Sequence, residues 1–315
     1  MRKLIGIVIS LAATVVPAAP ATVGDYAMRA ELVAPGVYAV IAPARDFPTA
    51  ENRGWNSNST FVVTNEGVLV IDSGSSETIG KALRRAIAGV TDRPVRWIIN
   101  THGHGDHWLG NAALADGKTE IIASSTVRNR IDKEGAEWVA RFNTMTGGAT
   151  GDSRVVRPNQ AHDARVAIAF GELKAELIPS QDAHSPGDLV VWLPQQRTLI
   201  GGDVLYTERA PATFDSNLPR WIAFLKELEA LKPVKIIPGH GPVAAGASVS
   251  YLRAYFEDLW NVVEAGYQEG KPDFEILPKA IQVMARHKTH FPDLDSRLGE
   301  SVSHTYLQVE AAEFK

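Results

Sequence analysis

The sequence of 315 residues predicts an α/β protein in which layers of β-sheet are covered by helices. Short apolar runs of strand character alternate with helix-like segments, and this order favours stacked layers of sheet and helix. The composition is that of an ordinary globular protein, 45% hydrophobic and 22% charged. Four turns that carry histidine or aspartate follow predicted strands, as functional loops do on such scaffolds.

The first 21 residues are predicted to be a secretory signal peptide. Arg2 and Lys3 precede an apolar run at residues 4–16, and small residues then lead to a cleavage site after Ala21. A bilayer span needs about 20 apolar residues, so this run is too short to cross a membrane. The alternative is a buried N-terminal strand. We expect a periplasmic or secreted mature protein without a membrane span.

The first half of the chain shows clear strand and helix signals. Strands are expected at residues 37–41, 60–64, 68–72, 95–100 and 119–123, and helices at residues 77–88 and 125–142. The first of these helices can be capped by Ser75 or Ser76. Residues 143–151, rich in glycine and threonine, are expected to form a mobile loop.

The second half repeats the pattern and then becomes helical. Strands are expected at residues 164–170, 173–178, 189–193, 198–200 and 234–237, with a helix at residues 218–231. From residue 247 onward the sequence favours helices, interrupted at Gly270-Lys271-Pro272.

The octet at residues 101–108, Thr-His-Gly-His-Gly-Asp-His-Trp, holds four potential metal ligands in six positions. In an extended segment His102 and His104 point to the same side, and Asp106 continues that register. A turn through Gly105 could bring His107 to a neighbouring position. Imidazole and carboxylate ligands together suit zinc and related divalent metals. The alternative is a set of solvated loop histidines.

Three further polar residues follow predicted strands. They are His184, Asp203 and His240, and their loops also contain glycines that permit tight turns. Taken singly, each could be an ordinary surface, capping or turn residue. Their common placement at strand ends favours a shared site with the octet. The remaining histidines are outside these loops, and a solvated face is expected for His287 and His290.

Composition excludes several classes of partner and site. The formal charge is −4 and no basic run occurs, so a nucleic-acid partner is not expected. Cysteine is absent, so disulfides, thiolate ligands and a cysteine nucleophile are excluded. The expected partner is a small-molecule substrate, and the oligomeric state is left open.

The order of His102-x-His104-x-Asp106-His107, His184, Asp203 and His240 resembles the metallo-β-lactamase superfamily over about residues 37–242. The resemblance implies a four-layer αβ/βα sandwich. It would form a catalytic domain at residues 22–246, followed by a C-terminal helical extension at residues 247–315. Residues 69–74 and 98–111 are most similar to the periplasmic subgroup called quinoprotein relay system zinc metallohydrolases.

The resemblance also implies a dinuclear centre of two Zn²⁺ ions, with manganese or iron as possible substitutes. His102, His104 and His184 would bind the first metal, Asp106, His107 and His240 the second, and Asp203 would bridge them. A metal-bridging hydroxide would attack a carbonyl centre of an ester, thioester or lactone. Asp106 would orient the hydroxide, and Tyr206 would hold the carbonyl oxygen or else simply pack with its hydroxyl hydrogen-bonded.

Several alternatives remain open at this point. The commonest metallo-β-lactamases have a cysteine where this chain has Asp203, so β-lactam hydrolysis is the second choice. A di-iron redox enzyme and a non-catalytic periplasmic metal-binding accessory protein are further options. Asp72 and Asn100 are expected to support the ligands. Three tryptophans could line a substrate groove, although packing in the core is favoured for each: Trp55, Trp108 and Trp221.

Overall fold

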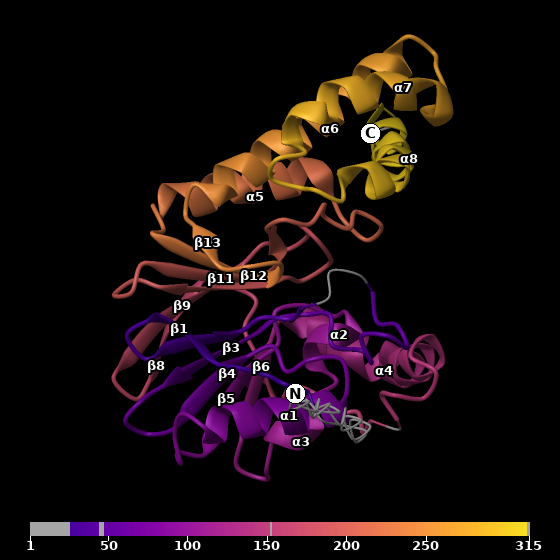
Figure 1. The fold of residues 1–315 in the computed structure, drawn as a ribbon. Coiled ribbons are helices and arrows are strands. Elements are labelled where there is room, and N and C mark those ends of the chain that lie inside the picture. Colours follow the sequence, from indigo (N-terminus) through magenta and orange to yellow (C-terminus); the bar gives the residue numbers. More distant parts are fainter. Residues whose placement is uncertain (1–25, 44–46, 152, 314–315) are drawn as a thin grey trace, which may run out of the picture.

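The computed structural model describes residues 26–43, 47–151 and 153–313, so the expected signal peptide is outside the described part of the chain. The predicted fold is confirmed. Two β-sheets lie face to face, with helices on both outer faces and further helices at the C-terminal end (Figure 1). Within the described ranges, no helix is both long enough and apolar enough to cross a bilayer.

The first sheet is built from the N-terminal part of the chain. Its described strands lie in sequence order: β1 (Glu31–Ala34), β2 (Val37–Val40), β3 (Ser59–Val63), β4 (Val68–Ile71), β5 (Val95–Ile99), β6 (Glu120–Ala123) and β7 (Gln160–Ala161). Pairing is antiparallel from β1 to β4 and parallel from β4 to β7. The parallel strands direct their carboxyl ends to one edge, where the octet begins.

The second sheet is built from the following part of the chain. Its described strands are β8 (Val166–Phe170), β9 (Leu173–Pro179), β10 (Leu189–Leu193), β11 (Thr198–Tyr206), β12 (Lys235–His240) and β13 (Ala244–Ala245). Only β11 and β12 pair in parallel among them. These two strands continue past their predicted ends. The backbone bends at Gly202, where φ is +48°, and the strands pair again at Tyr206 and His240.

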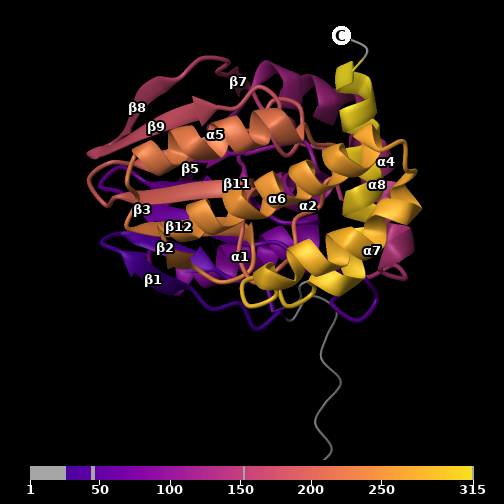
Figure 2. The same ribbon diagram turned by 90° about the horizontal axis from the view of Figure 1, so that it is seen from above.

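The helices lie on the outer faces of the sheets, apart from the last two, which pack on another helix (Figures 1 and 2). They are α1 (Glu77–Ala88), α2 (Gly105–Trp108), α3 (Asn111–Leu114), α4 (Ser125–Met145), α5 (Leu218–Ala230), α6 (Ser248–Gln268), α7 (Asp273–Met284) and α8 (Leu294–Glu313). Ser76 caps α1 by accepting a hydrogen bond from the backbone N–H of Ile79. Helix α4 extends to Met145, so it includes the start of the predicted loop at residues 143–151.

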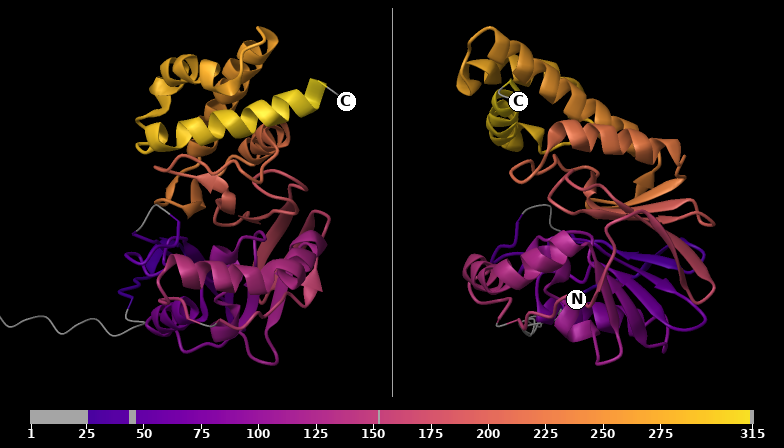
Figure 3. Two further views of the ribbon diagram at one scale, coloured as in Figure 1. Left: turned by 90° about the vertical axis from the view of Figure 1, so that its right-hand side faces the viewer. Right: turned by 180° about the vertical axis from the view of Figure 1, so that it is seen from behind.

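Apolar side chains fill the space between the layers. Leu69 and Ile71 from the first sheet meet Val191, Ile200 and Ile237 from the second in one buried cluster. A different cluster joins the outer face of the second sheet to α5 and to all three C-terminal helices. Helices α7 and α8 pack on α6, away from the sheets (Figure 3).

The expectation of a solvated face for His287 is wrong. The side chain is 5% exposed, and its Nε2 lies 2.7 Å from a carboxylate oxygen of Asp258 on α6. This contact ties the end of α7 to α6. His290 is partly buried and stacks on Tyr251, with ring centroids 4.1 Å apart.

Candidate metal centre

The octet leaves β5 as a loop and then forms the one-turn helix α2. His102 and His104 precede this helix, and their ring centroids are 4.8 Å apart. The expectation that Asp106 continues their extended register is wrong, because Asp106 and His107 lie on the helix. The helical turn brings both side chains round to the cluster. All four side chains are buried, with Asp106 the most exposed at 8%.

The four predicted loops meet at one place. Two groups of potential ligand atoms form there, each with its atoms within 4.8 Å of one another: His102, His104, His184 and Asp203 in one, and Asp106, His107 and His240 in the other. The residues come from β11, β12 and the loops that follow β5 and β9. All seven residues predicted as ligands are therefore gathered.

Asp203 lies between the two groups. One carboxylate oxygen is 3.2 Å from Nε2 of His107. The other is 3.2 Å from Nε2 of His240 and 3.6 Å from Nε2 of His184. Gly239 leaves room for this carboxylate, because a Cβ on Gly239 would stand 2.0 Å from it.

The buried atoms that face the cluster fit a metal. Nε2 of His102, Nε2 of His107 and Oδ1 of Asp203 have no hydrogen-bond partner in the described part of the chain. Buried polar atoms are normally satisfied, so an unmet set of nitrogen and oxygen atoms pointing at one place indicates a missing ion. Imidazole and carboxylate are ligands that zinc accepts.

Asp72 supports the centre as predicted. It follows β4 in a left-handed conformation (φ 59°) and accepts a hydrogen bond of 2.8 Å from Nδ1 of His107. It also accepts from the backbone N–H and the hydroxyl of Thr101. The same expectation for Asn100 is wrong: its side chain pairs with Asn111 on α3, not with a ligand.

Other supporting residues were not predicted. Asp215 lies 3.1 Å from Nε2 of His104 and accepts a hydrogen bond of 2.7 Å from Arg130 on α4. Burial alone would raise the pKa of Asp215, but the hydrogen bonds from His104 and Arg130 lower it. Asn56 donates a 2.9 Å hydrogen bond to Asp106. No motif marks these residues, which come from loops or helices distant in the sequence.

The loops that carry His184 and His240 are fixed by polar contacts. Asp188 accepts hydrogen bonds from the backbone N–H and the hydroxyl of Ser185. Asn58 donates to the carbonyls of Pro238 and Gly241 at 2.9 and 2.7 Å. Holding the loops in this way preorganises the ligands and reduces the cost of ordering them on binding.

Burial and neighbouring charge set the protonation of the ligands. Burial lowers the pKa of His184 to about 3 and also lowers the pKa values of His102 and His240. These imidazoles are therefore neutral and able to bind a metal at neutral pH. Burial opposes the charge of His107 as well, but Asp203, Asp106 and Asp72 outweigh it and raise its pKa well above 6.5.

Tyr206 is 1% exposed, and its hydroxyl donates a 2.6 Å hydrogen bond to Asp203. Burial and the Asp203 charge raise its pKa well above 10, so the hydroxyl stays protonated. Trp108 and Trp221 are fully buried, and Trp221 packs against His184 with centroids 5.4 Å apart. Trp55 packs partly buried against the first sheet's core. The favoured core interpretation therefore holds for all three tryptophans.

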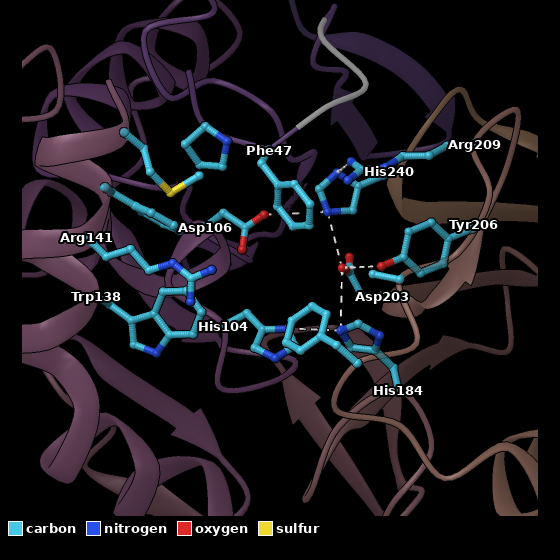
Figure 4. Close-up of a pocket in the computed structure, with 15 residues that line it drawn as sticks. Phe47, His104, Asp106, Trp138, Arg141, His184, Asp203, Tyr206, Arg209 and His240 are labelled. Carbon is cyan, nitrogen blue, oxygen red and sulfur yellow. Dashed lines mark hydrogen bonds and ion pairs between the residues drawn. The ribbon is translucent and has the colours of Figure 1, made fainter. Parts of the chain in front are cut away.

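A pocket opens onto the centre (Figure 4). His104, Asp106, His184, Asp203 and His240 converge on it, beside Tyr206. Sequence reasoning did not find the rest of its wall. That wall combines apolar side chains with two arginines: Phe47, Trp138, Phe142, Met145, Phe214, Arg141 and Arg209.

Two facing sheets, outer helices and this cluster of potential metal ligands describe an αβ/βα sandwich that carries a candidate metal site. Residues 52–240, more than half of the chain, match the family model described as the metallo-beta-lactamase superfamily. The chain belongs to this superfamily. The finer resemblance to the quinoprotein relay subgroup stays a prediction.

Curated relatives within the superfamily are distant. The chain is 23% identical over 220 residues to the linear primary-alkylsulfatase of Pseudomonas sp. (strain ATCC 19151), covering 58% of this chain and 40% of that protein. It is 26% identical to a beta-lactamase-like protein 2 homolog of Caenorhabditis elegans, covering 59% of this chain and 56% of that protein. It is also 24% identical to the metallo-beta-lactamase type 2 of Bacillus sp. (strain 170), covering 59% and 67%. The chain thus spans only about half the length of the first two relatives.

Solved structures share the fold. A metallo-beta-lactamase from Pontibacter korlensis superposes with a TM-score of 0.60 at 19% identity, covering 73% of this chain and 99% of that one. A double mutant of the sec-alkyl sulfatase PisA1 gives a TM-score of 0.68 at 16% identity, covering 89% of this chain and 50% of that one. At such identities the likeness concerns the fold alone.

Proposed function

We propose that the protein is a dinuclear zinc hydrolase that cleaves an ester, thioester or lactone at its carbonyl carbon. The position of Asp203 carries the proposal, because its two oxygens face ligands of both groups. One ion would be held by His102, His104 and His184, the other by Asp106, His107 and His240, with Asp203 shared. Bound zinc would polarise the carbonyl and lower the pKa of water to about 7.

The protein's own residues would orient the reactants. Asn56 holds one oxygen of Asp106, which leaves the other to accept a hydrogen bond from the attacking water. Tyr206 is protonated and lies at the pocket, so it can donate to an oxyanion if it leaves Asp203. In the structure it holds Asp203, and we propose the contact with the substrate oxygen as its second role.

The test is Asp203→Ala, assayed for bound metal and for turnover of an aryl ester, a thioester and a lactone. We expect two zinc ions in the parent and no more than one in the variant. Losing a supporting partner of a metal ligand already costs about 10- to 100-fold, so kcat/KM should fall by at least about 100-fold. Asp132→Ala, which removes an exposed partner of Arg157, is the matched control and should retain both properties. Full metal content and activity in Asp203→Ala would refute the proposal.

A β-lactamase is the second candidate, favoured by the similarity to a protein named as a metallo-beta-lactamase. Asp203 argues against it, because the commonest metallo-β-lactamases place a cysteine there. A nitrocefin-type lactam belongs in the same assay panel. Efficient lactam turnover without ester, thioester or lactone turnover would make β-lactam hydrolysis the first candidate. A metal-binding accessory role would gain support if Asp106→Ala left every cellular phenotype unchanged.

We also propose that the protein is exported. This rests on the basic start, the apolar run and the small residues of residues 2–21. N-terminal sequencing of protein recovered from the periplasm or medium should begin at Thr22, and an intact N-terminus would contradict export by this route.

A further inference from the structure

The pocket wall carries two arginines that have no acidic partner among the described residues. Arg141 on α4 lies over the ring of Trp138 at 5.2 Å and points toward the pocket (Figure 4). Arg209, after β11, lies on the opposite side next to His240 (Figure 4). By contrast, Arg130, also on α4, pairs with both Asp215 and Glu134.

Arg209 is the more unusual of the two. It is 2% exposed, and a guanidinium stays charged at any pH that a protein survives. Among the described residues its Nε has no hydrogen-bond partner, and the ring centroid of Phe47 lies 5.8 Å from the guanidinium carbon. Buried charges are normally paired, because removing one from water without a counter-charge is unfavourable. Among the residues that the structure describes, no carboxylate pairs with Arg209, so the guanidinium is suited to bind an anionic group.

Within the described ranges, the side chain that hydrogen-bonds Arg209 is His240, and it would not accept this bond once it binds a metal. Nδ1 of His240 lies 2.8 Å from Nη1 of Arg209, and it also lies 2.8 Å from the carbonyl oxygen of Asn56. A neutral imidazole has one N–H and one acceptor. Nε2 of His240 faces Asp203 and Asp106 at 3.2 and 3.5 Å, so a metal there leaves the proton on Nδ1. The N–H at Nδ1 would then donate its hydrogen bond to the carbonyl oxygen of Asn56. The guanidinium of Arg209 would be left to bind an acceptor group of the substrate.

The rest of the wall is apolar. Phe142 and Met145 lie with Trp138 along α4, facing Phe47 and Phe214. Phe214 is 43% exposed and lies 5.1 Å from the ring of His104. An apolar wall with one buried cation suits an amphiphile, because the hydrophobic part loses contact with water while the charge finds its partner.

We propose that the substrate is an anionic amphiphile whose negative group pairs with Arg209, apart from the reacting carbonyl, and whose apolar part packs on this wall. Arg141 adds a second positive charge at the entrance. The inference rests on the proposed carbonyl hydrolysis and specifies its substrate class. A carboxylate or a sulfate-type oxyanion supplies the same acceptor chemistry.

The kinetic test compares two aryl esters of equal chain length, one ending in a carboxylate and the other in a neutral amide. The zinc-loaded parent should prefer the anionic ester in kcat/KM by about 10- to 100-fold, the range expected for a hydrogen bond to a charged group. Arg209→Met should abolish the preference, and Arg209→Lys should keep part of it. Lys226→Met, which removes one positive charge from an exposed position on α5, should keep all of it. No preference in the parent, or a preference unchanged in Arg209→Met, overturns the inference.

A binding test separates this inference from the proposed reaction. Hexanesulfonate and hexyl methyl sulfone have the same apolar chain, and only the first is charged. Calorimetry on zinc-loaded protein should show tighter binding of the sulfonate, lost in Arg209→Met and partly kept in Arg209→Lys. If the sulfonate binds with this dependence on Arg209 while no ester is cleaved, the anion-binding site is supported and the proposed carbonyl hydrolysis is wrong. If an alkyl sulfate is cleaved and the anionic ester is not preferred, the anion is the reacting group and the inference is wrong.

Discussion

His107 differs from the other histidines of the centre because three carboxylates face it. Burial opposes its charge, but Asp203, Asp106 and Asp72 together raise its pKa well above 6.5. Burial keeps His184 neutral, with a pKa of about 3. In the metal-free protein His107 is therefore the imidazole that carries a proton at neutral pH. A metal that binds its Nε2 must displace that proton.

This predicts that stability depends on pH differently in the metal-free and zinc-loaded proteins. A raised pKa in the folded state gives stability that is complete below the unfolded value of 6.5 and is lost as pH rises through the folded value. The metal-free protein should lose this contribution above pH 6.5, whereas the zinc-loaded protein, with His107 unprotonated, should not. The rise in Tm on adding zinc should therefore grow from pH 6 to pH 8.

Calorimetry in buffers of different ionisation enthalpy counts the protons that are released when zinc binds. Zinc binding near pH 7.5 should release about one proton per protein. Asp72→Asn removes one of the charges that raise the His107 pKa and should lower this count. A zinc effect on Tm that does not change with pH, together with no released proton, would show that His107 is neutral in the metal-free protein.

At this scale the sequence predicts which polar side chains gather at the centre, but it predicts few of the residues that support them. The candidate ligands lie within a strand or in the segment that follows one, with glycines nearby, and this pattern is visible in the local sequence. Asp215 and Asn56 reach their partners across 111 and 50 residues of sequence, and nothing nearby distinguishes them from other loop residues. Asp72 was found because the strand that it follows lies beside the one leading to the octet.

At the scale of elements, strand ends and tight turns position the site. The long strands and helices were predicted because their apolar periodicity extends over many residues. The strand at Glu31–Ala34 was missed because Val33 is its one buried residue, and α2 and α3 were missed because one helical turn is too short to show the helical periodicity. The extension of β11 through Asp203 depends on pairing with β12, which local sequence does not reveal.

The turn at the end of β12 provides the element-scale prediction. Gly239 has no Cβ, and one placed there would stand 2.0 Å from Oδ1 of Asp203 and 2.7 Å from the backbone of Gly202. Gly239→Ala should push the carboxylate away from His107 and lower zinc affinity by about 10- to 100-fold, as loss of ligand orientation does. It should also cost about 1–3 kcal/mol of unfolding free energy through overpacking.

Competition with a chromogenic chelator and urea unfolding would measure these two effects. Gly117→Ala is the matched control, because nothing lies within 4 Å of its added Cβ. We expect the control to change stability by less than about 0.5 kcal/mol. Equal zinc affinity in both variants would mean that the Asp203 carboxylate does not need this space.

On the scale of the whole molecule, the C-terminal helices are part of the catalytic fold's packing. The apolar residues of α5, α6, α7 and α8 belong to one buried cluster with the outer face of the second sheet. Apolar packing therefore crosses residue 246, and the domain boundary expected there stays a prediction. Three aromatic rings in contact connect α6 to the candidate metal centre. The ring centroid of Phe256 on α6 lies 4.3 Å from that of Trp221, and the Trp221 centroid lies 5.4 Å from that of His184.

This continuity predicts that a cavity in α6 affects both stability and the site. Phe256 is fully buried, and Phe256→Ala should cost about 3–5 kcal/mol of unfolding free energy. Because Trp221 loses its backing, the His184 loop should loosen and zinc affinity should fall. Phe274→Ala on α7 removes the same side chain from a position 69% exposed, and should cost less than about 0.5 kcal/mol with unchanged affinity. Denaturant unfolding and zinc titration of both variants measure the free energy of unfolding and the zinc affinity. A Phe256→Ala protein of unchanged stability would place α6 outside the cooperative core.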